Sequence, residues 1–149
     1  MNWQTIFYVA LALFVGGLGG IHVPINGAIG ARINSALVAT FTFYGIAFVL
    51  ISGLVLLTWN PAAFQALSTV PRWYFIAGVI SVIVVGGSTF LIPRIGAVNM
   101  FVLVLVAQML VRLVISHYGL LESPVSPITP YKLIGAAMLL AGTVLVVRY

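Results

Sequence analysis

Five long apolar runs, separated by short stretches with polar residues or proline, are the dominant pattern of the sequence. A helix needs about 20 mostly apolar residues to cross the roughly 30 Å hydrocarbon core of a bilayer. The runs have about this length and predict five transmembrane helices in a single transmembrane domain, residues 1–149. The predicted spans are residues 6–31 with a break near 20–24, 36–59, 73–92, 97–118 and 131–147.

Polar residues and prolines at the borders of the runs support these limits. Asn34 and Ser35, either of which can cap a helix, precede the second run, and Thr129 followed by Pro130 precedes the last one. A hydroxyl at this position can accept a hydrogen bond from a free N–H group of the first turn, and proline is favoured in that turn. We therefore expect helices to begin directly after Ser35 and Thr129.

The first span contains a proline, Pro24. Proline lacks an N–H group and its ring clashes with the preceding turn, so we expect a kink or break near Gly20. A broken helix leaves backbone groups free at membrane depth, where they must meet protein or a water-filled cavity. This makes Asn26 a candidate binding residue. In the alternative, Pro24 only ends the span near an interface.

The fourth span, residues 97–118, carries Gln108 and Arg112 four positions apart, on one face of a helix. A helix of this length reaches about 33 Å, which places Arg112 about 6 to 7 Å from the bilayer centre. A guanidinium there is costly unless it faces protein or water. Three interpretations stay open: Arg112 attracts a solute in a central cavity, extends to the interface, or pairs with Glu122 of the partner subunit.

The composition agrees with a membrane protein and excludes several functions. Hydrophobic residues make up 63% of the chain and charged residues 5%, against roughly 25% charged in soluble domains. The net charge of +5 comes from scattered basic residues, which does not indicate nucleic-acid binding. With one acidic residue and no cysteine, the chain has no acid–base pair or carboxylate metal cluster. We expect no enzyme activity, no cofactor and no metal site.

The basic residues do not fix the orientation of the chain in the membrane. Counted along five spans, one side receives Arg32, Arg94 and Arg148. The other side receives Arg72, Lys132 and the N-terminal amine. Orientation follows the excess of Lys and Arg, and three side chains against two is a small excess. We hypothesise insertion in both orientations and an antiparallel homodimer, whose second copy supplies an inverted repeat. A single, weakly biased orientation is the alternative.

Nearly the whole chain resembles the small five-span branch of the drug/metabolite transporter superfamily, the YdcZ family. The most specific similarities are Asn26-Gly27, the turn Pro93-Arg94-Ile95-Gly96-Ala97, the pair Ala107-Gln108 and the segment His117-Tyr118-Gly119-Leu120. The resemblance implies half of a ten-helix bundle, completed by antiparallel pairing with itself or a paralogue. It also implies a central site lined by the first, third and fourth helices.

Two positions depart from the family pattern. Ser116 stands where an acidic residue is frequent, and Arg112 stands where a small residue is usual. These changes argue against proton-coupled export of cations and favour anionic or zwitterionic substrates.

The candidate substrate-binding residues are Asn26, Ser81, Gln108 and Arg112. The predicted function is secondary transport, with export favoured, of small polar or anionic metabolites or drugs across a prokaryotic plasma (inner) membrane. Its partners are the lipid bilayer, a second copy or a paralogue, and the small-molecule substrate. The alternatives are a dual-topology anion channel and a membrane subunit that transports nothing.

Overall fold

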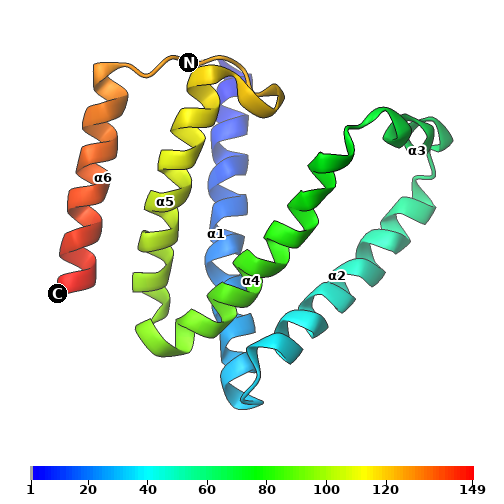
Figure 1. The fold of residues 1–149 in the computed structure, drawn as a ribbon, viewed down its shortest axis with the longest axis horizontal. Coiled ribbons are helices and arrows are strands. Elements are labelled where there is room, and N and C mark those ends of the chain that lie inside the picture. The colour runs from blue at the N-terminus through cyan, green and yellow to red at the C-terminus, as the bar shows by residue number, and fades with distance from the viewer. Residues whose placement is uncertain (1) are drawn as a thin grey trace. The chain divides into compact units, whose positions relative to one another are not determined.

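The computed structural model describes residues 2–149, and its long segments are helices (Figure 1). Within these residues, five helical segments are long and apolar enough to cross a membrane. They are built on α1 (Trp3–Arg32), α2 (Ala36–Leu57), α4 (Ile76–Ile95), α5 (Ala97–Tyr118) and α6 (Pro130–Arg148). The predicted all-α fold with five membrane-spanning helices is therefore confirmed.

Short helical elements connect the spans. Between α2 and α4 lie α3 (Pro61–Ala66) and the 3-10 turns η1 (Leu67–Thr69) and η2 (Arg72–Phe75). The 3-10 turn η3 (Leu120–Glu122) follows α5. The Ser35 hydroxyl accepts from the Val38 N–H group at 3.2 Å, and the Thr129 hydroxyl accepts from the Lys132 N–H group at 3.4 Å. Both predicted helix starts are thus present with the expected hydrogen bonds.

Two prolines lie inside helices, which corrects the predicted limits. Pro24 lies within α1, which is one continuous helix, so the break predicted near residues 20–24 is absent. Pro93 lies within α4, which runs on to Ile95. A proline inside a helix deprives only the carbonyl four residues earlier of its donor, whereas a break in lipid would free several backbone groups. The chain turns instead at Gly96, where φ is +82°, a conformation that glycine adopts without strain.

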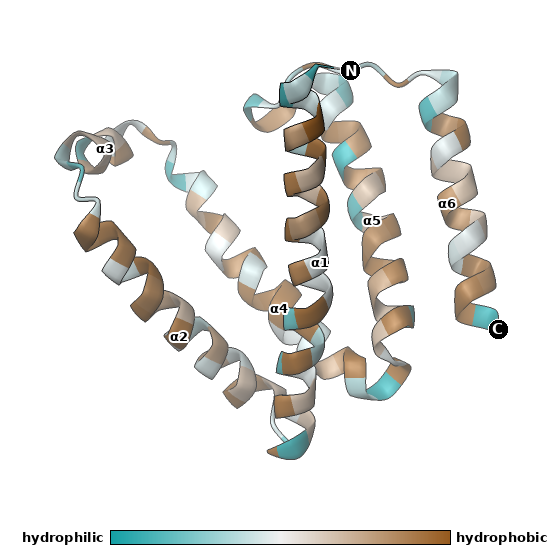
Figure 2. Cartoon of the chain, turned by 180° about the vertical axis from the view of Figure 1, so that it is seen from behind, coloured by the Kyte–Doolittle hydropathy of each residue, from teal (hydrophilic) through white to brown (hydrophobic). Residues whose placement is uncertain are grey.

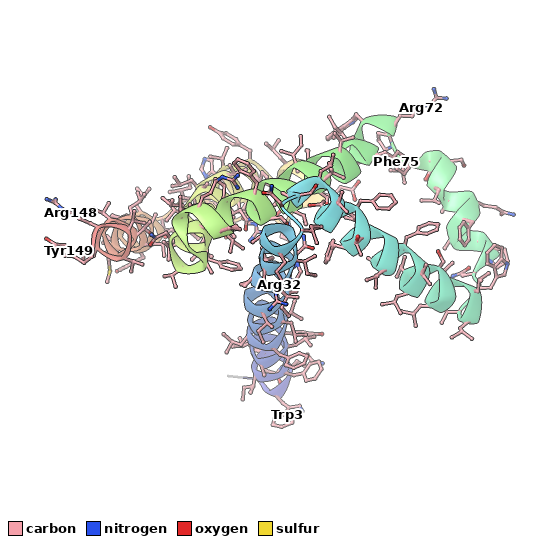
Figure 3. The ribbon with its side chains drawn as sticks, turned by 90° about the horizontal axis from the view of Figure 1, so that it is seen from below. Trp3, Arg32, Arg72, Phe75, Arg148 and Tyr149 are labelled. Atoms are coloured by element: carbon pink, nitrogen blue, oxygen red, sulfur yellow. The ribbon has the colours of Figure 1, made fainter. Side chains whose placement is uncertain are left out.

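The chain divides into two compact units, Met1–Arg94 and Ile95–Tyr149. In the first unit, the buried positions of α1 are Asn26, Gly27 and Gly30, all in its C-terminal half. The residues of α1 before Gly19 are exposed along their length. Figure 3 shows Trp3 at the far end of α1 and Arg32 at the end near which α2 begins. The helices of this unit therefore meet around the second half of α1.

The second unit is a hairpin of α5 and α6, which lie side by side and run in opposite directions (Figure 1). Residues 123–129, here called the connector, join η3 to α6. The Ser126 N–H group donates to the Ser116 carbonyl at 2.8 Å, and the Ile128 N–H group donates to His117 Nδ1 at 3.0 Å. These two bonds fasten the connector to the last turn of α5.

The distribution of side chains is that of a protein in an apolar solvent. Large apolar side chains are exposed on every long helix, while the hydrophilic colours of Figure 2 gather mainly in the loops and at the helix ends. In the described part of the chain, five polar side chains are buried against four apolar ones. The polar ones are Asn26, Thr40, Ser88, Thr89 and Thr143. Such an arrangement suits lipid outside and a polar interior.

Candidate functional site

A buried polar pair joins α1 to α4 in the first unit. Asn26 Nδ2 donates to Thr89 Oγ1 at 2.6 Å, and Thr89 Oγ1 in turn donates to the Val85 carbonyl at 2.8 Å. Asn26 is 3% exposed and Thr89 is 1% exposed. An amide and a hydroxyl buried between apolar helices lose water, and this hydrogen bond compensates part of that cost.

Glycines allow α1 to approach α4 closely beside this pair. A Cβ atom added at Gly30 would lie 2.9 Å from Thr89 Cγ2, and one added at Gly27 would lie 3.0 Å from Ile92 Cγ2. Both distances are shorter than ordinary van der Waals contacts, so a larger residue at either position would force Thr89 or Ile92 to shift. Small residues at helix contacts serve the same purpose in many membrane proteins. The Asn26–Thr89 bond thus depends on the glycines that flank it on α1.

A cavity of about 700 Å³ opens beside the pair. Its walls come from the last turn of α1, the start of α2 and the C-terminal half of α4. The lining residues are Gly30, Ala31, Asn34, Ser35, Ala36, Leu37, Gly86, Thr89, Phe90, Pro93 and Arg94. Thr89 therefore belongs both to the buried pair and to the cavity wall. The volume lies in the range of small-molecule sites.

The amide oxygen of Asn26 keeps an unused acceptor. In residues 2–149, every fully buried side-chain nitrogen or oxygen has a hydrogen-bond partner. The Asn26 bond to Thr89 uses the amide nitrogen, and no donor among the described residues reaches the amide oxygen. The amide oxygen is therefore not fully buried. It can accept a hydrogen bond from a solute or from water.

Ser81, the second predicted site residue, lies half-buried on α4 and bonds to a residue of α2. Its hydroxyl lies 2.5 Å from the Tyr44 hydroxyl. Tyr44 also packs edge-on against Phe43, and the two ring centroids are 5.2 Å apart. The sequence did not single out Tyr44, because nothing in an apolar helix such as α2 marks the face that meets α4.

Gln108 and Arg112, the other two predicted residues, lie on α5 in the second unit. Gln108 is half-buried, whereas Arg112 is exposed and lines a groove of about 470 Å³. The residues that line this groove, hereafter the α5–α6 groove, are Leu105, Met109, Arg112, Leu113, Ser116, Ser126, Lys132 and Leu139. Gln108 is not one of them. Of the two residues, Arg112 lines this groove.

Lys132 forms the rim of the groove and was not predicted as a site residue. Its Nζ atom donates to the Ser126 hydroxyl at 2.6 Å, to the Pro127 carbonyl at 2.8 Å and to the Ser126 carbonyl at 3.1 Å. These three acceptors use all three donors of the ammonium group. The Lys132 charge is therefore held at a fixed place beside the connector. On sequence alone, Lys132 looked like an ordinary basic residue at a helix end.

The predicted residues thus fall into two pairs, Asn26 and Ser81 in one unit and Gln108 and Arg112 in the other. Each unit combines apolar outer surfaces with polar side chains that line a cavity or groove, which is the pattern of a multi-pass membrane protein. The chain belongs to the family described as "Putative inner membrane exporter, YdcZ", which matches residues 7–145. No curated protein and no solved structure matches it. The family expected from the sequence is confirmed, and with it a place in the inner membrane.

Proposed function

We propose that this chain exports small polar or anionic metabolites or drugs by alternating access, as an antiparallel dimer in a prokaryotic inner membrane. The observation that carries the proposal is the buried Asn26–Thr89 pair beside a cavity of about 700 Å³, within helices that are otherwise apolar. Polar side chains within membrane-spanning helices are rare and often face the bundle interior or a water-filled cavity. The family description supports export.

The Asn26–Thr89 pair has the chemistry to hold a polar solute. The free Asn26 amide oxygen accepts hydrogen bonds, and Pro93 cannot donate to the Thr89 carbonyl, so a second acceptor is left in the wall of the cavity. Ser81 lies on the same helix as Thr89, two turns nearer its start, and continues the polar path. A solute with N–H or O–H donors would therefore replace water in this path.

Gln108 and Arg112 on α5 are the proposed substrate-binding residues of the second unit. Arg112 carries a permanent positive charge and up to five N–H donors, which suits a carboxylate or a phosphate. Gln108, one turn earlier, offers a neutral donor and acceptor. These side chains favour anionic over cationic solutes, because the single acidic residue, Glu122, lies outside the long helices.

The antiparallel arrangement is supported by the charge count and by the number of spans. Three basic side chains on one side against two on the other give no firm orientation. Transporters commonly use two inverted repeats around a site near the membrane midplane. A second copy of this five-span chain, inserted in the inverted orientation, can supply the second repeat. An inverted paralogue could supply it as well.

A ligand screen followed by flux measurement tests the proposal. The purified protein is screened by thermal shift against carboxylates, phosphates and amino acids, and the stabilising class is then followed into proteoliposomes. We expect slow, saturable flux that falls at least tenfold in Thr89→Val. The matched control is Thr42→Val, because the Thr42 hydroxyl bonds only to the Val38 carbonyl of its own helix and is exposed.

Three results would contradict the proposal. An ohmic current that does not saturate would indicate an anion channel. Purified protein that moves no solute would indicate a subunit of a larger assembly. Equal loss of flux in Thr89→Val and Thr42→Val would show that the buried pair has no special role in transport.

A further inference from the structure

The α5–α6 groove has two chemically different ends. Its residues on α5 follow the spacing of one helical face, and the stretch from Leu105 to Ser116 spans about 16 Å at 1.5 Å per residue. The part toward the middle of α5 is lined by Leu105 and Met109, with Leu139 from α6. The part toward the connector is lined by the basic Arg112 and Lys132 and the hydroxyl side chains of Ser116 and Ser126, with Leu113 as its apolar member. The groove therefore changes from apolar to polar along its length.

The polar end carries two positive charges and no negative one. Arg112 and Lys132 both line it, together with Ser116 and Ser126, and none of the residues that form the groove is acidic. The three bonds from Lys132 to the connector hold its charge at the rim. Two cations that share one pocket in an apolar medium repel each other unless an anion lies between them.

Arg112 has its donors free for such an anion. In the described part of the chain the exposed guanidinium makes no hydrogen bond. A guanidinium binds carboxylate or phosphate through two parallel N–H···O bonds. Basic pockets between transmembrane helices are a known way to bind anionic headgroups. The free donors and the second charge together define a place for one anionic group.

We propose that the α5–α6 groove binds an amphiphilic anion, a phosphate or carboxylate group that carries an apolar chain. The anionic group lies against Arg112 in the field of Lys132, and the chain lies along Leu105, Met109 and Leu139. The groove volume of about 470 Å³ lies in the range of small-molecule sites. The inference rests on the proposed function in one respect, since it narrows the substrate class. The same chemistry is offered by a soluble alkyl phosphate and by an anionic phospholipid of the bilayer.

Binding is tested on the full chain in nanodiscs of phosphatidylcholine, which is zwitterionic. Decyl phosphate is titrated and the thermal midpoint recorded, with inorganic phosphate and decanol as the separate halves of the ligand. We expect a saturable rise of the midpoint with decyl phosphate alone. Arg112→Gln weakens binding at least tenfold, and Arg112→Lys weakens it several-fold because the bidentate geometry is lost. Arg148→Gln, a basic residue of α6 outside the groove, binds like the unaltered chain.

If decanol or inorganic phosphate raises the thermal midpoint as much as decyl phosphate does, the groove does not require an amphiphilic ligand. If Arg112→Gln binds decyl phosphate with unchanged affinity, Arg112 does not form the site. The Arg112→Lys variant keeps the charge and guards against a folding defect in Arg112→Gln. Replacing part of the phosphatidylcholine by phosphatidylglycerol separates the two sources. If phosphatidylglycerol competes with decyl phosphate in the unaltered chain but not in Arg112→Gln, the occupant of the groove is the bilayer lipid. Undiminished decyl phosphate binding identifies the soluble amphiphile, and both results support the site.

The binding assay does not require transport, so the inference and the proposed function can fail separately. If decyl phosphate binds at Arg112 but the protein shows no flux, the proposed binding site is supported and the proposed export function is contradicted. If a polar solute shows saturable flux but decyl phosphate does not bind, the proposed export function is supported and the proposed binding site in the groove is contradicted.

Discussion

Gly30 shows how one missing methyl group determines the packing of α1. A Cβ atom there would lie 2.9 Å from Thr89 Cγ2 and 3.4 Å from the Ala36 backbone, and a shift of the buried Thr89 would disturb its bonds to Asn26 and to the Val85 carbonyl. We predict that Gly30→Ala lowers the free energy of unfolding by about 1–3 kcal/mol, as overpacked positions do. Thermal unfolding in detergent measures this.

Gly17→Ala is the control for Gly30→Ala, because nothing lies within 4 Å of the added atom. Alanine favours a helix over glycine by about 0.5–1 kcal/mol, so this variant should be unchanged or slightly more stable. A similar loss of stability in both variants would mean that the close contact between α1 and α4 is not the cause of the lower free energy of unfolding in Gly30→Ala.

The Tyr44–Ser81 bond gives a second prediction for single residues. Tyr44→Phe and Ser81→Ala each remove one partner of a hydrogen bond between α2 and α4. We expect each to cost about 1 kcal/mol, and the double variant to cost less than the sum, with a coupling of about 0.5–1.5 kcal/mol. Tyr74→Phe is the control, since no hydrogen bond of its hydroxyl is present in the described residues. Strict additivity would contradict a direct bond.

The sequence singled out Asn26 and Ser81 as candidate residues, but not the residues to which they bond. Asn26 and Ser81 stand out because polar residues are rare in apolar spans. Thr89 and Tyr44 could not be assigned as their partners, since the polar residues of α2 and α4 are spread over the helices and the sequence marks no single face. Partners 63 and 37 residues away depend on how the helices rotate and cross.

Among the elements, the connector between α5 and α6 relies on side-chain hydrogen bonds more than any helix does. Lys132 holds Ser126 and Pro127 through three bonds, while its own backbone N–H group is capped by Thr129. We predict that Lys132→Met costs about 1–3 kcal/mol, the range for a bond from a charged group. Amide hydrogen exchange at Ser126 and Ile128 should speed up at least tenfold, because both amides bond to the end of α5.

Arg148→Gln is the matched control for Lys132→Met, because Arg148 is a basic residue of the same helix at its opposite, exposed end. It should leave exchange at Ser126 and Ile128 unchanged. Fast exchange in the unaltered chain would show that the connector is not held by these bonds.

Element limits were predictable where a local signal exists. The starts of α2 and α6 follow from Ser35 and Thr129, whose hydroxyls cap the first turn as expected. The prolines were misleading, because Pro24 and Pro93 lie inside helices although proline usually ends one. In lipid, a continuous helix with one free carbonyl costs less than a break with several, and the sequence alone does not show which neighbours satisfy that carbonyl.

At the scale of the whole molecule, the near balance of basic residues makes the orientation sensitive to single substitutions. Tyr149→Arg changes the count of basic side chains from three against two to four against two, and Gln65→Lys with Ser68→Lys changes it to three against four. All three positions are exposed, so stability should not change. We predict opposite single orientations for the two variants, because loops with more Lys and Arg stay in the cytoplasm.

Orientation is read from single cysteines, which the natural sequence lacks. A cysteine at Phe64 should react with an impermeant maleimide in about half of the unaltered molecules in intact cells, in nearly all molecules of one variant and in few of the other. If transport needs both orientations, each variant alone is inactive and their co-expression restores flux. Activity in a strictly one-sided variant, or one-sided labelling of the unaltered chain, would exclude the antiparallel homodimer, because no second copy of this chain would then supply the inverted repeat.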